Sequence, residues 1–260
     1  MEPKPRLIGV DASNFDSFPC CGIQCGTHPG RVQKKAWLRA NAKFGVRAKV
    51  LLAADGKPGG YIEYIPGEHA WRGVDARGYL FLHCVWIHAR RYQSRGWGGL
   101  MVEDFVAEAR AAGLRGAAAM VREGPWMADR RLFLSKGFEP VDSAPPDFHL
   151  MARKFDVDAP NPAFRKDWDR KAARYGAGLT IIRSAQCPHI AKFADEIAET
   201  AAGEYGIEPT VVELRSWRDA QKAPTPYAVF AILYDGRVVA DHQISRTRFR
   251  NIMRREVGGG

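Results

Sequence analysis

The stretch from Arg90 to Arg110, "RRYQSRGWGGLMVEDFVAEAR", restricts the fold more than any other part of the chain. It follows an apolar run, "GYLFLHCVWIH", that favours a β-strand, and it continues as an amphipathic helix up to Gly113. Glycines between a strand and a helix let the backbone approach a ligand closely, and the N–H groups at a helix N-terminus attract anions. The stretch therefore predicts an α/β protein in which a loop between a strand and a helix binds phosphate.

Two common phosphate-binding motifs do not match this loop. Its glycines stand at positions 96, 98 and 99, which does not fit G-x-G-x-x-G, and the Gly-Lys-Ser/Thr of a P-loop is missing. The spacing that does fit is Q/R-x-x-G-x-G/A, which runs from Gln93 to Gly98.

The rest of the chain predicts two successive α/β domains. Residues 1–155 alternate helical and strand patterns, and residues 156–176 are polar with two prolines, which is typical of a linker. Residues 177–260 then show a new pattern, β-α-β-α-β-β-α. We therefore expect one domain over 1–155 and a smaller one over 177–260.

Composition narrows the class of partner. The net charge is +10, but the arginines are scattered without a basic run, which favours a small anionic ligand over nucleic acid. No apolar window is long enough for a membrane span, and the N-terminal residues lack the apolar region of a secretory signal, so we expect a cytoplasmic protein without a membrane partner. The five cysteines are an odd number and predict reduced thiols rather than a disulfide framework.

Several motifs, taken in order, resemble a known superfamily. The Q-x-x-G-x-G loop with a strand before it, a helix after it and "FLSKGF" downstream is similar to the GCN5-related N-acetyltransferases. The segments "CCGIQC", "IEYIPGEHAW" and "GYLFLHCVW", with "CP" and "APTP" near the C-terminus, resemble the members that carry a YoaP-like C-terminal domain. This resemblance implies a mixed sheet flanked by helices, followed by a small thioredoxin-like α/β domain.

The resemblance also implies an activity and a cofactor site. It points to an acyl-CoA-dependent N-acyltransferase, with acetyl-CoA as the expected co-substrate, in which the amine of a small molecule attacks the thioester directly. Backbone N–H groups of Val85, Trp86 and Ile87 would then bind the thioester carbonyl. The pyrophosphate would lie on the loop Gln93, Ser94, Arg95, Gly96, Trp97, Gly98 and Gly99.

The chain departs from the superfamily at its usual acid. Phe133 stands where a tyrosine often protonates the leaving thiolate, and Trp126 stands where an asparagine is frequent. Glu63 and Glu68 are candidate bases acting through water, and His83 or His88 could serve instead, with Cys84 beside the thioester. The alternatives are a solvated carboxylate at a strand end and a core histidine.

The cysteines suggest two further sites. Cys20, Cys21 and Cys25 lack zinc-knuckle spacing, so we expect no metal and place them at the acceptor site; small buried hydrophobes are the alternative. Cys187 precedes a predicted helix at the position of a thioredoxin-like nucleophile, with Pro226 at the place of that fold's cis-proline. Because Ile190 replaces the second cysteine, the sequence predicts a reactive monothiol.

A second function remains open at this point. The chain could be a thiol-redox or ligand-binding protein whose acetyltransferase domain is vestigial, because both usual proton donors are missing. The acceptor amine, the acyl length and the oligomeric state do not follow from the sequence.

Overall fold

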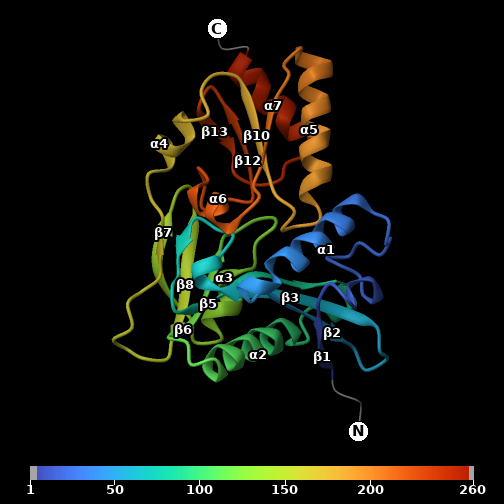
Figure 1. Cartoon of the computed structure of the whole chain (residues 1–260), viewed down its shortest axis with the longest axis vertical. Coiled ribbons are helices and arrows are strands. Elements are labelled where there is room, and N and C mark those ends of the chain that lie inside the picture. The colour runs from blue at the N-terminus through green and yellow to red at the C-terminus, as the bar shows by residue number, and fades with distance from the viewer. Residues whose placement is uncertain (1–4, 89, 258–260) are drawn as a thin grey trace. The chain divides into compact units, whose positions relative to one another are not determined.

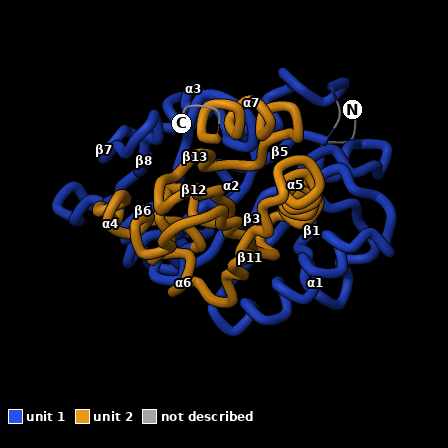
Figure 2. Tube along the Cα trace, turned by 90° about the horizontal axis from the view of Figure 1, so that it is seen from above, with its two compact units in different colours: residues 1–70, 74–164 blue, residues 71–73, 165–260 orange. Residues whose placement is uncertain are grey.

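The computed structural model of the chain describes residues 5–88 and 90–257 (Figure 1). These residues form two compact units, which Figure 2 distinguishes by colour. Unit 1 contains the described residues of 1–70 and 74–164, and unit 2 contains those of 71–73 and 165–260.

Unit 1 is built on a seven-stranded mixed sheet with the order β1-β2-β3-β5-β6-β8-β7. All neighbours are antiparallel except β5 and β6, which are parallel. The strands are β1 (Arg6–Val10), β2 (Arg47–Leu52), β3 (Pro58–Pro66), β5 (Tyr79–Ile87), β6 (Gly116–Val121), β7 (Glu139–Ala144) and β8 (Phe148–Lys154), and β4 (Val74–Asp75) pairs separately with β9 (Ala163–Phe164). The helices are α1 (Pro29–Asn41), α2 (Trp97–Ala111) and α3 (Arg130–Leu134).

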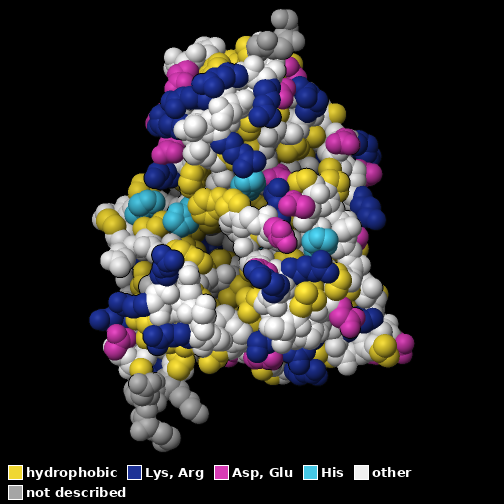
Figure 3. Space-filling model, turned by 180° about the vertical axis from the view of Figure 1, so that it is seen from behind, with side chains coloured by type: hydrophobic (Ala, Val, Ile, Leu, Met, Phe, Trp, Pro, Cys, Tyr) yellow, Lys and Arg dark blue, Asp and Glu magenta, His cyan; other side chains and the backbone are white. Residues whose placement is uncertain are grey.

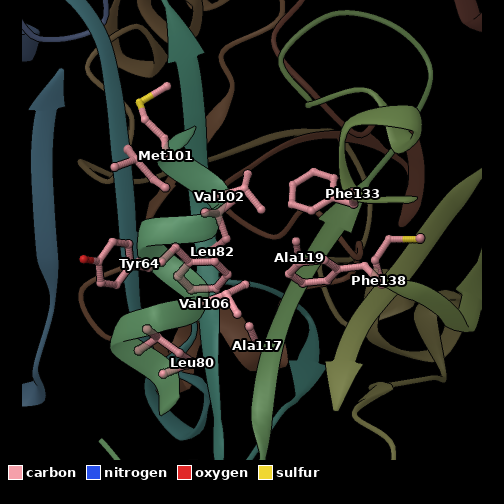
Figure 4. Close-up of a cluster of buried hydrophobic side chains, with 14 of the residues drawn as sticks. Tyr64, Leu80, Leu82, Met101, Val102, Val106, Ala117, Ala119, Phe133 and Phe138 are labelled. Atoms are coloured by element: carbon pink, nitrogen blue, oxygen red, sulfur yellow. The ribbon is translucent and has the colours of Figure 1, made fainter. Parts of the chain in front are cut away.

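The main core of unit 1 lies between α2 and the sheet (Figure 4). Met101, Phe105 and Val106 of α2 are buried against strand residues such as Ile62 and Leu82. Each large apolar side chain buried in this way contributes about 1.5–3 kcal/mol to folding. Side chains alternate along a strand. Every second residue of β3 therefore faces α2, and the residues between them point to the opposite face of the sheet.

Helix α1 covers that opposite face. Lys34 and Trp37 of α1 contact Glu63 of β3 and His83 of β5, whereas the neighbouring Ile62 packs in the α2 core. The helix begins at Pro29, where the missing N–H costs nothing, and His28 accepts a hydrogen bond from Gly30 N. The predicted mixed sheet flanked by helices is thus confirmed for unit 1.

Unit 2 contains a four-stranded sheet with the order β11-β10-β12-β13. Strands β10 and β11 are parallel, and the other two pairs are antiparallel. The strands are β10 (Leu179–Arg183), β11 (Thr210–Glu213), β12 (Phe230–Tyr234) and β13 (Arg237–Ala240), and the helices are α4 (Trp168–Ala173), α5 (Ile190–Tyr205), α6 (Trp217–Lys222) and α7 (Arg246–Val257). From β10 to α7 the element order is the predicted β-α-β-α-β-β-α.

A tripeptide from the first half of the chain, Trp71–Gly73, is part of unit 2. Gly73 N donates to Pro226 O at 3.0 Å, and the Arg72 guanidinium donates to Gln186 Oε1 at 3.2 Å. Trp71 and Arg72 are both buried. No composition change marks this tripeptide, so the sequence placed it in the first domain.

The segment predicted as a linker, residues 156–176, has regular structure. It contains β9 and α4, and Phe164 and Ala172 within it are buried. Its polar composition comes from the exposed side chains that lie beside these buried ones. Composition alone does not distinguish exposed from buried positions. The division between the units falls between Phe164 and Arg165.

Candidate active site

Strands β5 and β6 pair over only half of the length of β5. Their register runs from Tyr79↔Gly116 to Leu82↔Ala119 and then stops. Beyond Leu82, β5 stays paired with β3 as far as Ile87, while β6 continues beside β8. Within the described residues, the second half of β5 therefore has an unpaired edge on the side of β6.

The hydrogen bonds to β3 decide which backbone groups lie on this edge. His88 N donates to Gly59 O at 2.9 Å. In an antiparallel ladder every second residue bonds to the same neighbour, so Trp86 and Cys84 also face β3. The N–H groups of Val85 and Ile87 accordingly point to the unpaired edge.

A β-bulge at His83 sets the direction of the side chains around this edge. Glu63 pairs with Cys84 and Tyr64 with Leu82, so His83 is the extra residue of β5. Leu82 and Val85 consequently both pack toward the α2 core, and His83 and Cys84 both lie on the α1 face. The bulge thus places two chemically active side chains in succession on one face.

The predicted phosphate loop leads directly into α2. Ser94 and Gly96 have left-handed backbone conformations with φ of 57° and 75°, and the helix begins at Trp97. The first N–H groups of a helix have no partner inside it, so Trp97, Gly98 and Gly99 present donors at this end. The positive end of the helix dipole adds to their attraction for an anion.

Aromatic packing fixes the loop against the sheet. The rings of Tyr92 and Trp97 are stacked with centroids 4.7 Å apart. A Cβ atom at Gly59 would lie only 2.5 Å from Trp97 Cζ3, so the indole rests directly on the glycine backbone of β3. Gly98 has more room than Gly59. The atom nearest to a Cβ added at Gly98 belongs to Leu132 of α3 and lies 3.6 Å away, which is an ordinary contact.

A buried polar network lies on the α1 face beside the bulge. Lys34 of α1 forms an ion pair with Glu63 of β3, and both side chains are almost fully buried. Tyr61 Oη donates to Glu63 Oε2 at 2.7 Å, and His83 Nδ1 lies 3.3 Å from Glu63 Oε1. Burial alone would raise the pKa of Glu63, but Lys34, and after it His83, outweigh burial and hold that pKa well below its usual range.

This network changes the role expected of Glu63. The sequence suggested a base near a strand end, yet the carboxylate is enclosed and engaged by three partners. A carboxylate with a lowered pKa is a weak base, and one without solvent contact does not receive a proton directly from a substrate. Its geometry fits a positioning residue that holds His83 and α1.

Three thiols converge beside the network. Contact with the thiols of Cys20 and Cys84, and then burial, raises the pKa of Cys21 well above its usual value. Cys25 is different, because it is exposed and its hydrogen bond with Thr27 lowers its pKa. Cys84 is partly exposed, so within the trio it is the thiol nearest to solvent.

Arg31 fastens the cysteine loop to α1. Its buried guanidinium donates to the carbonyls of Phe18 and Ile23 at 2.8 Å, on either side of Cys20 and Cys21. A hydrogen bond from a charged group contributes about 1.5–3 kcal/mol. The loop is therefore held in a fixed place over the α1 face of β5.

The positions of the usual proton donors agree with the departure seen in the sequence. Phe133 is fully buried in the α2 core and packs edge-on against Phe138 with centroids 5.3 Å apart. Trp126 is exposed in the loop after β6, with a left-handed φ of 70°. Neither side chain has a proton to give.

The structure differs from expectation around Cys187 in unit 2. Helix α5 begins at Ile190, so the thiol lies before the helix rather than at its first residue. Among the described residues the cis peptide bond is Pro145–Pro146, so the bond preceding Pro226 is not cis. Gln243 Nε2 lies 3.8 Å from the sulfur of Cys187, which is partly exposed.

Sequence reasoning missed Lys34 and did not predict the environment of His88. Lys34 reads as an ordinary polar position of an amphipathic helix, and only the packing of α1 on the sheet turns it inward. His88 was considered only as an alternative base, yet both of its ring nitrogens are buried without a hydrogen-bond partner among the described residues. Burial lowers the pKa of His88 to about 4, so its ring is neutral near pH 7.

The described residues hold no cluster of three or more His, Cys, Asp or Glu side chains that could bind a metal ion. None of the helices in 5–88 and 90–257 combines the length and apolar character that crossing a membrane requires.

On the face shown in Figure 3, Lys and Arg side chains are spread among Asp and Glu rather than gathered into one basic patch.

Comparison with known proteins places these features in context. Residues 210–251 match the family described as YoaP-like. Over 248 residues the chain is 28% identical to the uncharacterized N-acetyltransferase YoaP of Bacillus subtilis (strain 168). The aligned region covers 92% of this chain and 94% of that protein.

Two solved structures are also similar to part of the chain. One is yncA, a putative acetyltransferase from Salmonella typhimurium with its cofactor acetyl-CoA, at 20% identity and a TM-score of 0.45, covering 60% of this chain and 98% of that one. The other is a GNAT family acetyltransferase from Brucella melitensis in complex with acetyl-CoA, at 18% identity and a TM-score of 0.39, covering 62% and 95%.

The relative that spans nearly the whole chain and the match within unit 2 agree with the motifs read from the sequence. The chain is therefore a relative of the YoaP N-acetyltransferase with a YoaP-like region in its C-terminal half, which confirms the resemblance predicted from its sequence.

Proposed function

We propose that the chain is an acetyl-CoA-dependent N-acetyltransferase that acts on the amine of a small molecule at the divergence of β5 and β6. The observation that carries this proposal is the unpaired edge of β5 beyond Leu82, which ends at a glycine-rich helix N-terminus. One end of this edge offers N–H groups for a thioester carbonyl, and the other offers N–H groups for a pyrophosphate.

The backbone N–H groups of Val85 and Ile87 would bind the pantetheine arm and the thioester oxygen, while that of Trp86 is used by β3. As the amine attacks, negative charge develops on that oxygen, and a donor already in place stabilises it. The nitrogen–carbon bond forms as the carbon–sulfur bond breaks. With Phe133 and Trp126 at the usual acid positions, we assign both proton transfers to water.

The acceptor would lie on the α1 face. Cys84 and Trp86 of β5 face this side together with the loop of Cys20 and Cys21, because an added Cβ at Gly22 would lie 2.8 Å from the Trp86 ring. Glu63 and His83 support this wall as positioning residues. Cys25, which is exposed and outside the trio, is not part of the proposed acceptor wall.

Unit 2 has the strand order and directions of a thioredoxin-like fold, and we propose that fold for it. The alternative of a thiol-redox or ligand-binding protein with a vestigial transferase domain is less well supported, because the phosphate loop and the unpaired edge are both intact. A reactive Cys187 remains compatible with either function.

Titration of acetyl-CoA into the protein by calorimetry tests the proposal, using Gly98→Asp as the variant. An added Cβ at Gly98 meets no close contact, and a carboxylate in the first turn of a helix is favourable for folding. We therefore expect an intact fold and an affinity lowered by about tenfold or more through charge repulsion. Gly203→Asp adds the same carboxylate to α5, where nothing lies within 4 Å of the added Cβ, and is the control for charge away from the loop.

If Gly98→Asp binds acetyl-CoA as the wild type does, the loop is not the phosphate site. If the wild type itself does not bind acetyl-CoA, the transferase proposal fails as a whole.

A further inference from the structure

A pocket of about 530 Å³ lies in the loop between β6 and α3. Its lining is Arg122, Glu123, Gly124, Met127, Asp129, Arg130 and Arg131. The loop leaves β6 at Val121, directly after the part of this strand that β5 no longer accompanies. The pocket therefore lies in the loop that follows the separation of β5 and β6.

Two of the three arginines in this lining already have carboxylate partners. Arg122 Nε lies 2.6 Å from Asp147 Oδ1, and Arg131 makes a two-pronged contact with Asp129 at 3.0 Å and 2.6 Å. Asp129 also accepts from the backbone N–H of Arg131. Within the lining, these contacts neutralise the arginines Arg122 and Arg131 and occupy Asp129, which is one of the two acidic residues.

Arg130 is the third arginine and has a different environment. The residue as a whole is partly exposed, but its Nε is buried and has no hydrogen-bond partner among the described residues. A buried charged donor without an acceptor is unfavourable, and a ligand oxygen would remove this cost. The remaining acid, Glu123, is exposed and acts on Arg131.

We propose that this pocket binds an anionic group, a phosphate or a carboxylate, through the guanidinium of Arg130. The planar fork of arginine matches both groups, and an arginine without a protein carboxylate keeps its donors available for a ligand. The proposal rests on the proposed function, because the anion would belong to a substrate of the transferase. It is either the ribose 3′-phosphate of CoA or a carboxylate on the acceptor amine.

The first experiment measures binding of inorganic phosphate by calorimetry to the full-length protein, Arg130→Gln and Arg131→Gln, each carrying Gly98→Asp so that the proposed phosphate loop does not bind the same probe. We expect Arg130→Gln to lose binding by about tenfold or more, since a charge-assisted contact disappears. Arg131→Gln removes the same charge from the next residue, which is already paired with Asp129, and should bind phosphate as the wild type does. Circular dichroism confirms that each variant is folded.

Two further comparisons identify the source of the anion. If the wild type prefers CoA over dephospho-CoA and Arg130→Gln does not, the ligand is the 3′-phosphate. If that preference is unchanged but the variant no longer distinguishes amino acids from their decarboxylated amines as acceptors, the ligand is the acceptor carboxylate.

The proposal is overturned if Arg130→Gln equals the wild type in all three comparisons, or if Arg131→Gln loses as much. Gly98→Asp separates this outcome from a failure of the proposed function. Loss of phosphate binding only in Arg130→Gln supports the anion pocket even if Gly98→Asp has no effect on acetyl-CoA.

Discussion

Lys34 of α1 and Glu63 of β3 form an ion pair in which the two side chains are only 1% and 0% exposed. The pair joins the helix to the sheet at the strand that neighbours the His83 bulge, and Tyr61 and His83 share the same carboxylate. Removing two charges from water is costly, so such a pair is stable only while both members are present.

Glu63→Gln should therefore destabilise the fold of unit 1 strongly. The change leaves Lys34 buried without its counter-charge, which costs about 3–5 kcal/mol in comparable cases. Urea unfolding followed by tryptophan fluorescence measures the loss. The double variant Lys34→Met, Glu63→Leu removes both charges and should recover most of it; a double variant as unstable as Glu63→Gln would contradict this account.

The same pair predicts how stability depends on acid. The pKa of Glu63 in the folded state lies well below the ordinary value of 4.5. As the pH falls, Glu63 is therefore protonated in the unfolded chain before it is protonated in the folded one. Its contribution to the free energy of unfolding is complete above about pH 4.5 and declines as the pH falls further. Unfolding free energies measured from about pH 3 to about pH 7 should show this decline in the wild type and a weaker one in the double variant.

His88 predicts a separate effect at higher pH. Burial lowers its pKa from 6.5 to about 4, so protonation favours the unfolded state between these values. Stability should therefore decrease as the pH falls from about 6.5 toward about 4, and His88→Gln should reduce this decrease. Nuclear magnetic resonance of the ring should find it neutral at about pH 6; a charged ring there would refute the assignment.

Alkylation should distinguish the cysteines by exposure and pKa. Cys25 is exposed with a lowered pKa and should react with iodoacetamide first, while Cys21 is buried with a raised pKa and should react last. Cys187 stays a prediction from the sequence, with faster labelling than Cys84 and no insulin-reductase activity. Peptide mass mapping of the folded protein at increasing times gives the order.

Gly59→Ala should weaken acetyl-CoA binding without touching the loop itself. Its methyl group would lie 2.5 Å from the Trp97 ring, so the indole and the start of α2 must shift. We expect a several-fold lower affinity, because misplacing the donors of a site by about 1 Å is costly. Gly9→Ala, where nothing lies within 4 Å of the added methyl, is the matched control and should bind normally.

The sequence predicted the loop but not the network beside it, and the reason is the range of the interactions. Gln93, Gly96 and Gly98 form a local pattern between a strand and a helix, so spacing alone predicts where this loop lies. The pairing of Lys34 with Glu63 depends on how a helix rotates against a sheet, which long-range packing decides. The bulge at His83 also has no residue signature, since nothing in "LHCV" marks an extra residue.

For a related reason, composition did not reveal the regular structure of the segment predicted as a linker. A linker is recognised by composition, and residues 156–176 have the composition of one although Phe164 and Ala172 are buried. The end of the helix predicted to stop at Gly113 was placed well, because a glycine with a left-handed φ is a local signal.

The tripeptide Trp71–Gly73 has a consequence for how the protein is made. On the ribosome it emerges well before Arg165, yet its Gly73 bonds to Pro226, near the end of the chain. Gly73 can form this hydrogen bond only after Pro226 has been synthesised. The two halves are therefore not modules that gene fusion or truncation can exchange cleanly, because a cut at residue 164 leaves part of the second half inside the first.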